Sequence, residues 1–274
     1  MNTVEKNQAI GLLIITGILL AYFTFFSNTN EPSKNTATET VTPVMPQVIV
    51  EPKDDATPKS IASTDSGNVY VGVEQTTIIE NDVIKVYFSN KGAQIKTAQL
   101  KDFETYRKQP LYILDSLRNR LDWTWQSSDK QVYLSQMYFT PQVTASDSGT
   151  TLRYTLANSG LEVTYFVPKS GYQVQYYIKK KSDFLPTQNQ PKLTWWSPLP
   201  HNEKDITLSR STSTITYYYT DGSFKSLNET STDPQQDTLT QPTQWLGFKQ
   251  KFFTAALISK SAFTSGSVST KIYP

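Results

Sequence analysis

Hydrophobic residues alternate with polar ones through much of the chain after residue 69, which is the pattern of half-buried β-strands. The clearest case is the pair of alternating runs at residues 152–156 and 161–167, on either side of an Asn-Ser-Gly turn at 158–160. Two such runs around a short turn predict a β-hairpin. A third run at residues 172–178 extends the hairpin to a meander, whose apolar face needs a second sheet to cover it.

Shorter alternating or apolar runs predict further strands on both sides of this meander. They cover residues 84–88, 94–100, 111–117, 121–125, 132–139 and 214–219. We expect Pro141 to close the run at 132–139. Residues 228–244 are polar, and we expect a loop there. Residues 245–258 fit a helix face and a strand pattern equally well, and the β-rich surroundings favour two consecutive strands.

A different pattern occupies residues 9–26, which begin at Ala9, end at Phe26 and carry no charge. A helix of that length spans roughly 27 Å, close to the roughly 30 Å hydrocarbon core of a bilayer. We therefore predict a transmembrane helix that contacts the lipid bilayer. A cleavable signal peptide is the alternative, but the run ends in aromatic residues where cleavage needs small ones. A buried core helix is a second alternative.

The segment at residues 27–68 contains five prolines and no aromatic residue. Such a segment buries too little apolar surface to offset the conformational entropy lost on folding. We expect a disordered polar tether. The predicted organisation is a short tip at residues 1–8, a transmembrane helix at 9–26, the tether at 27–68 and one β domain at 69–274.

Composition excludes several classes of function. The chain has 26 basic and 24 acidic residues, so it offers no basic field for nucleic acid. It contains no cysteine, which excludes disulfides, thiolate metal sites and cysteine nucleophiles. Its single histidine, His201, excludes chemistry that needs two imidazoles from one chain.

His201 is followed by two carboxylates, Glu203 and Asp205, either of which would orient a general base. A loop histidine after a proline turn is the simpler interpretation, and we adopt it. No glycine-rich phosphate loop of the G-x-G-x-x-G or Walker type occurs. We therefore expect no catalytic residue, no cofactor and no metal site.

Clustered aromatic residues are the remaining candidates for binding. Trp195, Trp196, Tyr217 and Tyr219 would form a platform for a sugar or for an unfolded segment. Packing within the sheet is the competing explanation, because alternating aromatic residues in strands mostly serve the core.

Two blocks of sequence carry a family resemblance. They are ENDVIKVYFSNKGAQIKTAQLKDFETYRKQPLYILD at residues 80–115 and QWLGFKQKFFTAALIS at residues 244–259. Together with the preceding apolar run and tether, they resemble the N-terminal half of YidC-type membrane protein insertases from Gram-negative bacteria, especially those of the Bacteroidetes type.

The resemblance implies an uncleaved anchor in the cell inner membrane. Its N-terminus lies in the cytoplasm, and the large domain that follows lies in the periplasm. The implied fold is mainly β, an antiparallel β-supersandwich similar to galactose mutarotases. The implied function is that of an insertase and chaperone component, which assists insertion, folding and assembly of inner-membrane proteins without being an enzyme. The implied partners are nascent membrane proteins and Sec translocon subunits. A stand-alone, membrane-anchored β-sandwich that binds carbohydrate is the alternative.

The sequence departs from the family pattern in two places. The family often has two glycines after the first strand, whereas here the turn contains Gly92 and Ala93, and alanine accepts a positive φ poorly. The family also has five further transmembrane helices that form the inserting groove. No apolar run after Phe26 is long enough to span a bilayer. We therefore expect a piece of a longer protein that lacks the C-terminal insertase helices.

Overall fold

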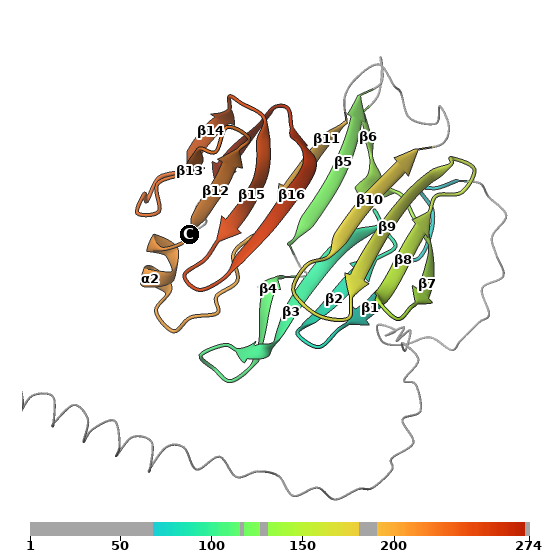
Figure 1. Ribbon diagram of the computed structural model, residues 1–274, viewed down its shortest axis with the longest axis horizontal. Coiled ribbons are helices and arrows are strands. Elements are labelled where there is room, and N and C mark those ends of the chain that lie inside the picture. Colours follow the sequence, from blue (N-terminus) through green and yellow to red (C-terminus); the bar gives the residue numbers. More distant parts are fainter. Residues whose placement is uncertain (1–67, 116–117, 127–130, 181–190, 272–274) are drawn as a thin grey trace, which may run out of the picture. The chain divides into compact units, whose positions relative to one another are not determined.

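The computed structural model of the chain describes residues 68–115, 118–126, 131–180 and 191–271 (Figure 1). Strands dominate these residues and pair in antiparallel sheets, which confirms the prediction of a mainly β fold. In chain order the elements are β1 (Thr76–Glu80), β2 (Ile84–Ser89), β3 (Gln94–Glu104), β4 (Pro110–Leu114), β5 (Arg120–Gln126), β6 (Gln131–Tyr133), η1 (Leu134–Gln136), β7 (Thr140–Ala145), β8 (Gly149–Thr155), β9 (Leu161–Pro168), β10 (Gln175–Lys180), β11 (Lys192–Trp196), α2 (Ile206–Ser211), β12 (Thr214–Tyr219), β13 (Phe224–Ser226), β14 (Gln235–Leu239), β15 (Thr243–Lys249), β16 (Thr254–Phe263) and β17 (Gly266–Thr270).

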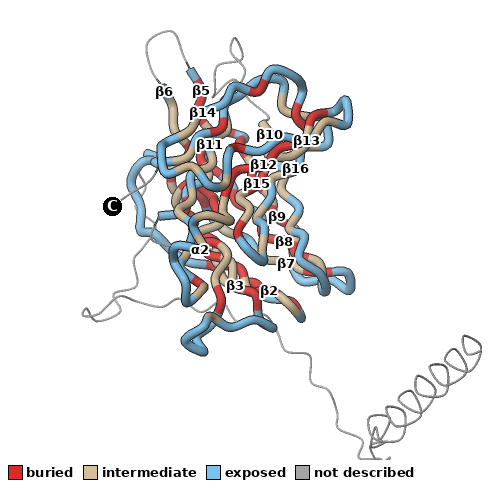
Figure 2. Tube along the Cα trace, turned by 90° about the vertical axis from the view of Figure 1, so that its left-hand side faces the viewer, coloured by how far each residue is buried: buried red, intermediate tan, exposed pale blue. Residues whose placement is uncertain are grey.

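The predicted three-stranded meander forms β8, β9 and β10 of the sheet β10-β9-β8-β7, and the edge strand β7 was not predicted. In it Leu152 pairs with Tyr165 and Tyr154 pairs with Val163, so the apolar positions of β8 and β9 share one face. All four side chains are buried, and Figure 2 shows buried positions recurring along both strands. The strict alternation of the sequence sets this register, because a slip of one residue would expose the whole apolar face.

The second sheet, β1-β2-β3-β4, covers that apolar face. The rings of Phe88 in β2 and Tyr165 in β9 lie 4.8 Å apart between their centroids, and the Tyr165 hydroxyl donates a 2.8 Å hydrogen bond to the Ala93 carbonyl. We call these two sheets and their shared core the first sandwich. Its buried core residues are Ile79, Ile84, Val86, Phe88, Ala93, Leu100, Leu111, Trp125, Leu134, Met137, Phe139, Leu152, Tyr154, Leu156, Leu161, Val163, Tyr165 and Val167.

The turn between β2 and β3 contains two left-handed residues, Gly92 at φ 79° and Ala93 at φ 48°. The sequence placed this conformation in doubt at Ala93, because left-handed backbone costs an alanine roughly 1–2 kcal/mol. The strain is offset by packing, since Ala93 is buried in the core and its carbonyl accepts from Tyr165. Tertiary contacts thus override the local preference.

A third sheet, β11-β5-β6, corrects the strand predicted at residues 132–139. Strand β6 ends at Tyr133, the 3-10 turn η1 follows, and β7 begins at Thr140. Pro141 therefore lies inside β7 and does not close a strand. Proline is compatible with β7 because this strand is the edge of its sheet, where alternate N–H groups face away from the neighbouring strand and form no ladder hydrogen bond.

The C-terminal strands make a smaller, separate core. The sheet β13-β12-β15-β16 packs against the two-stranded sheet β14-β17, and we call this pair the second sandwich. Strands β15 and β16 confirm the prediction for residues 245–258. The predicted loop at residues 228–244 is wrong, since it contains β14 and the start of β15. The buried core residues are Ile215, Tyr217, Tyr219, Leu227, Leu239 and Val268.

The predicted tip at residues 1–8, the transmembrane helix at 9–26 and all but the last residue of the tether at 27–68 lie outside the described residues. Within the described part of the chain, no helix combines the length and the apolar character needed to cross a membrane.

Candidate functional site

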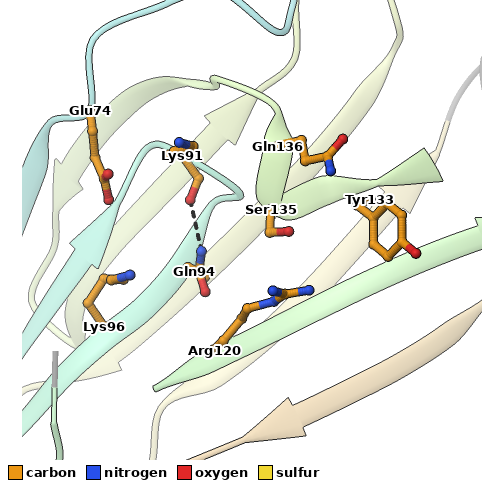
Figure 3. A pocket seen from close by; sticks show the side chains of 8 residues that line it. All are labelled: Glu74, Lys91, Gln94, Lys96, Arg120, Tyr133, Ser135 and Gln136. Carbon is orange, nitrogen blue, oxygen red and sulfur yellow. Dashed lines mark hydrogen bonds between the residues drawn. The ribbon is translucent and has the colours of Figure 1, made fainter. Parts of the chain in front are cut away.

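A polar pocket of about 540 Å³ lies where the first sandwich meets β5 and η1 (Figure 3). Three of its side chains are cationic, Lys91, Lys96 and Arg120, and one is a carboxylate, Glu74. The complete lining is Glu74, Lys91, Gln94, Lys96, Arg120, Tyr133, Ser135 and Gln136. No aliphatic side chain lines this pocket, so its chemistry suits a polar ligand with negative charge.

Asp122 does not line the pocket but binds two residues that do, Arg120 and Ser135. Its side chain is 2% exposed, and Oδ2 accepts from Arg120 Nη2 at 3.1 Å and from Ser135 Oγ at 2.6 Å. Its Oδ1 accepts from the Ser135 backbone N–H at 2.9 Å. A buried carboxylate with this many donors is satisfied, so it fixes the positions of β5 and η1 relative to each other.

The opposite wall is the turn between β2 and β3, which is hydrogen-bonded to the chain around η1. The Gly92 N–H donates to the Met137 carbonyl at 2.7 Å, and Lys91 forms a β-bridge with Tyr138. A Cβ added at Gly92 would lie 2.8 Å from the Ser135 Cα, so this close approach requires glycine. Gln94 then donates to the Lys91 carbonyl at 3.1 Å, the bond drawn in Figure 3.

A second hollow of about 400 Å³ contains His201 in its lining. The His201 ring lies 5.7 Å from the Tyr106 ring between centroids, and the buried Asn202 donates to the Tyr112 carbonyl at 3.0 Å. Asp205 instead caps α2, where its Oδ1 accepts from the Leu208 N–H at 2.9 Å.

No hydrogen bond or ion pair between His201 and either Glu203 or Asp205 occurs among the described residues. Within the same residues, no three His, Cys, Asp or Glu side chains gather closely enough to hold a metal ion.

The four aromatic residues singled out in the sequence occupy different environments. Tyr217 and Tyr219 are buried in the core of the second sandwich, where Tyr217 Oη donates to Asp237 Oδ2 at 2.5 Å. Trp195 is half-buried and donates from Nε1 to Asn119 Oδ1 at 3.0 Å, while Trp196 is 41% exposed. The structure does not bring the four onto one accessible face. A binding role for them stays a prediction, with Trp196 as the accessible member.

The pocket cations were missed in the sequence. Lys91, Lys96 and Arg120 look like ordinary surface charges, since they lie far apart in the sequence and belong to no recognisable motif. Their one sequence signal is the turn at Gly92, which indicates a close approach by some other part of the chain. Which part approaches is decided by contacts with residues 134–139, more than 40 positions away.

The sequence from residue 76 to residue 273 matches the family model described as YidC periplasmic domain. The chain belongs to the YidC periplasmic domain family. The match begins at β1 and covers every described strand, so both sandwiches and all of the pocket lining except Glu74 fall within the YidC periplasmic domain.

Relatives named membrane protein insertase YidC match over a wider range. The protein of Amoebophilus asiaticus is 28% identical over 97% of this chain and 46% of its own length. That of Cytophaga hutchinsonii is 28% identical over 98% of the chain and 45% of its own length. That of Parabacteroides distasonis is 26% identical over 76% and 33%. The chain thus spans about half the length, or less, of the curated YidC relatives that it matches.

Proposed function

We propose that this chain provides the anchor and periplasmic domain of a YidC-type insertase, and that it assists insertion, folding and assembly of inner-membrane proteins. The observation that carries the proposal is the family match over residues 76–273, together with relatives named membrane protein insertase over nearly the whole chain. Nascent membrane proteins are the partners, and Sec translocon subunits are proposed neighbours during insertion.

The domain contributes binding and positioning, without covalent chemistry. Insertion of a membrane protein lowers a transfer barrier for polar segments and breaks no bond, so it requires no nucleophile and no general base. Two observations are in keeping with this role. The lone histidine forms no ion pair with a carboxylate among the described residues, and three of the side chains that line the polar pocket are cationic.

The proposed placement has the N-terminus in the cytoplasm, residues 9–26 across the inner membrane and the β domain in the periplasm. It is supported by the apolar run and by the description of the matched family as a periplasmic domain. We also propose that the two sandwiches belong to a continuous supersandwich like that of galactose mutarotases.

Photo-crosslinking during synthesis of a membrane protein tests this function. A photoreactive phenylalanine replaces Asp147, Trp196 or Phe252, three exposed residues from separate parts of the domain. The chain is placed in inner-membrane vesicles, and a radiolabelled inner-membrane protein is then synthesised. We expect crosslinks to that nascent protein from at least one position, and none to a nascent cytosolic protein.

The proposal fails if all three positions stay uncrosslinked while the chain is folded and embedded. It also fails if the cytosolic protein is crosslinked as strongly as the membrane protein, because the domain would then lack selectivity for membrane substrates.

A further inference from the structure

The polar pocket of the first sandwich has more positive charge than its surroundings neutralise. Five ion pairs join described residues, and neither Lys91 nor Lys96 takes part in any of them. The Lys91 ammonium instead lies 5.4 Å from the centroid of the Tyr138 ring, and Glu74 accepts a 2.7 Å hydrogen bond from Ser89. Two ammonium groups at one opening therefore lack a carboxylate partner within the described part of the chain.

Arg120 adds a third cationic donor that is only partly used. Its Nη2 binds Asp122, yet its side chain remains 58% exposed at the pocket. A guanidinium carries five N–H donors, so several remain free for an anion after the bond to Asp122. Asp122 also accepts hydrogen bonds from the backbone N–H and the hydroxyl of Ser135, which fix its position. It therefore holds Arg120 in place without being part of the pocket lining.

The pocket is built before any ligand arrives. Its donors come from the β2–β3 turn, β3 and β5, and these elements are tied together by the backbone bond from Gly92 to Met137 and by the Asp122 network. Because the backbone that carries these side chains is fixed before binding, less conformational entropy is lost than at a mobile surface loop, which favours a specific site.

From these contacts we infer that this pocket binds a phosphate monoester, carried by a small soluble ester or by the headgroup of a phosphatidic acid. A phosphate monoester carries about −1.5 to −2 charges and three strong acceptor oxygens, which matches three cationic side chains from different elements in one pocket lining. A carboxylate offers one charge and two oxygens, and leaves part of this set unpaired. An apolar peptide segment finds no aliphatic contact in the lining. The site is independent of the proposed role in insertion.

Glu74 sharpens the proposal because its carboxylate is the one acidic group in the lining. It repels a bound phosphate, so the variant Glu74→Gln is expected to bind phosphate more tightly than the unaltered chain. Gain of affinity on removal of a negative charge is a result that general damage to the fold does not produce.

The test measures binding by isothermal titration to the whole purified chain, in mild detergent and phosphate-free buffer. The probes are glycerol 3-phosphate, a soluble short-chain phosphatidic acid, and acetate. We expect both phosphate probes to bind more tightly than acetate. Tighter binding of the lipid than of glycerol 3-phosphate identifies a membrane source of the phosphate, and equal or weaker binding of the lipid identifies a soluble source.

The double variant Lys91→Gln, Lys96→Gln is expected to lose about tenfold or more in affinity for glycerol 3-phosphate. The matched control is Lys204→Gln, an exposed lysine outside the pocket lining, and it should leave the affinity unchanged. Circular dichroism of each variant verifies folding.

The inference is overturned if the double variant binds glycerol 3-phosphate with unchanged affinity, if acetate binds as tightly as glycerol 3-phosphate, or if Glu74→Gln binds glycerol 3-phosphate more weakly. Absence of measurable binding of both phosphate probes to the folded, unaltered chain also overturns it.

Discussion

The two sandwiches of the domain are built from the same kind of antiparallel strand but differ in how they are held together. Among the described residues, the first sandwich and its neighbouring strands bury eighteen core residues, whereas the second sandwich buries six. In the first, strands such as β9 alternate regularly between buried and half-buried positions. In the second, β14 is exposed or half-buried everywhere except Leu239.

The second sandwich depends more on polar contacts. Tyr217 donates to Asp237 at 2.5 Å, Thr214 donates to the Leu227 carbonyl at 2.9 Å, and Lys249 forms a 2.7 Å ion pair with Glu229. Such bonds contribute little net free energy, since unfolding exchanges them for bonds to water. The comparison indicates that the first sandwich is the stable body, and the polar pocket lies on that body.

The largest expected effect comes from a cavity in the first sandwich. Leu152 is 0% exposed in the inner strand β8. Replacement by alanine should lower the free energy of unfolding by about 3–4 kcal/mol, because the packed neighbours cannot collapse into the space. Urea unfolding of the purified chain, followed by tryptophan fluorescence, measures the loss.

The equivalent change in the second sandwich should cost less. Leu239 ends β14, in a sheet of two strands, and Leu239→Ala is expected to lower the free energy of unfolding by about 2 kcal/mol, because a small exposed sheet relaxes more easily. The same urea titration measures it. A loss equal to or larger than that of Leu152→Ala would contradict the ranking of the two cores.

Two buried tyrosines separate hydrogen bonding from packing within the first sandwich. Tyr165→Phe removes the donor to the Ala93 carbonyl, and we expect a loss of about 1–2 kcal/mol because that acceptor stays buried and unpaired. The Tyr154 hydroxyl is buried, and the Thr77 side chain, its one candidate partner among the described residues, does not reach it with the geometry of a hydrogen bond. Tyr154→Phe should therefore leave thermal stability unchanged or raise it, and a marked drop would show that the hydroxyl has a partner.

The smallest effect is a pH dependence confined to the second sandwich. The hydrogen bond from Tyr217, followed by that from the Thr238 N–H, holds the pKa of Asp237 below its ordinary value of 3.8. A lowered pKa contributes stability that is present above pH 3.8 and is lost as the pH falls through the folded-state pKa. Asp237→Asn should thus be less stable than the unaltered chain at pH 7, and the difference should shrink on acidification.

The control for this pH effect is Asp233→Asn, since the Asp233 carboxylate has no hydrogen-bond partner in the part of the chain that is described. Thermal melts at several pH values should show no comparable change for this variant. If the stability difference between Asp237→Asn and the unaltered chain grew at low pH, the role given to the Asp237 carboxylate would be wrong.

Sequence patterns predicted the first sandwich better than the second. The hairpin of β8 and β9 follows from strict alternation around an Asn-Ser-Gly turn, where Asn158 and Gly160 adopt φ values of 54° and 64°. Strand β14 was missed because its residues are mostly polar, and its pairing with β17 rests on backbone bonds that no side-chain pattern reveals. The end of β6 at Tyr133 was missed for a related reason. The turn η1 is fixed by Asp122, a tertiary contact.

Local sequence patterns could not predict the candidate site. Its cations come from a turn and from two strands of different sheets, and they meet because Gly92 allows the turn to approach residues 134–139. The predicted aromatic residues show a second limit, because a sequence pattern can place residues on one face without showing whether that face is accessible. Alternation placed Tyr217 and Tyr219 on one face of β12, but the sequence did not reveal that this face is covered by β14 and β17.

The two sandwiches should differ in stability, with a stable first sandwich that carries a rigid pocket and a weaker second sandwich. Native-state hydrogen exchange, read by mass spectrometry on peptides of the intact purified chain, measures this difference. We expect the slowest exchange in β8, β9 and the residues 89–94 of the pocket turn, and faster exchange in β14 and β17. Exchange in β14 and β17 as slow as in β8, or rapid exchange of the pocket turn, would contradict it.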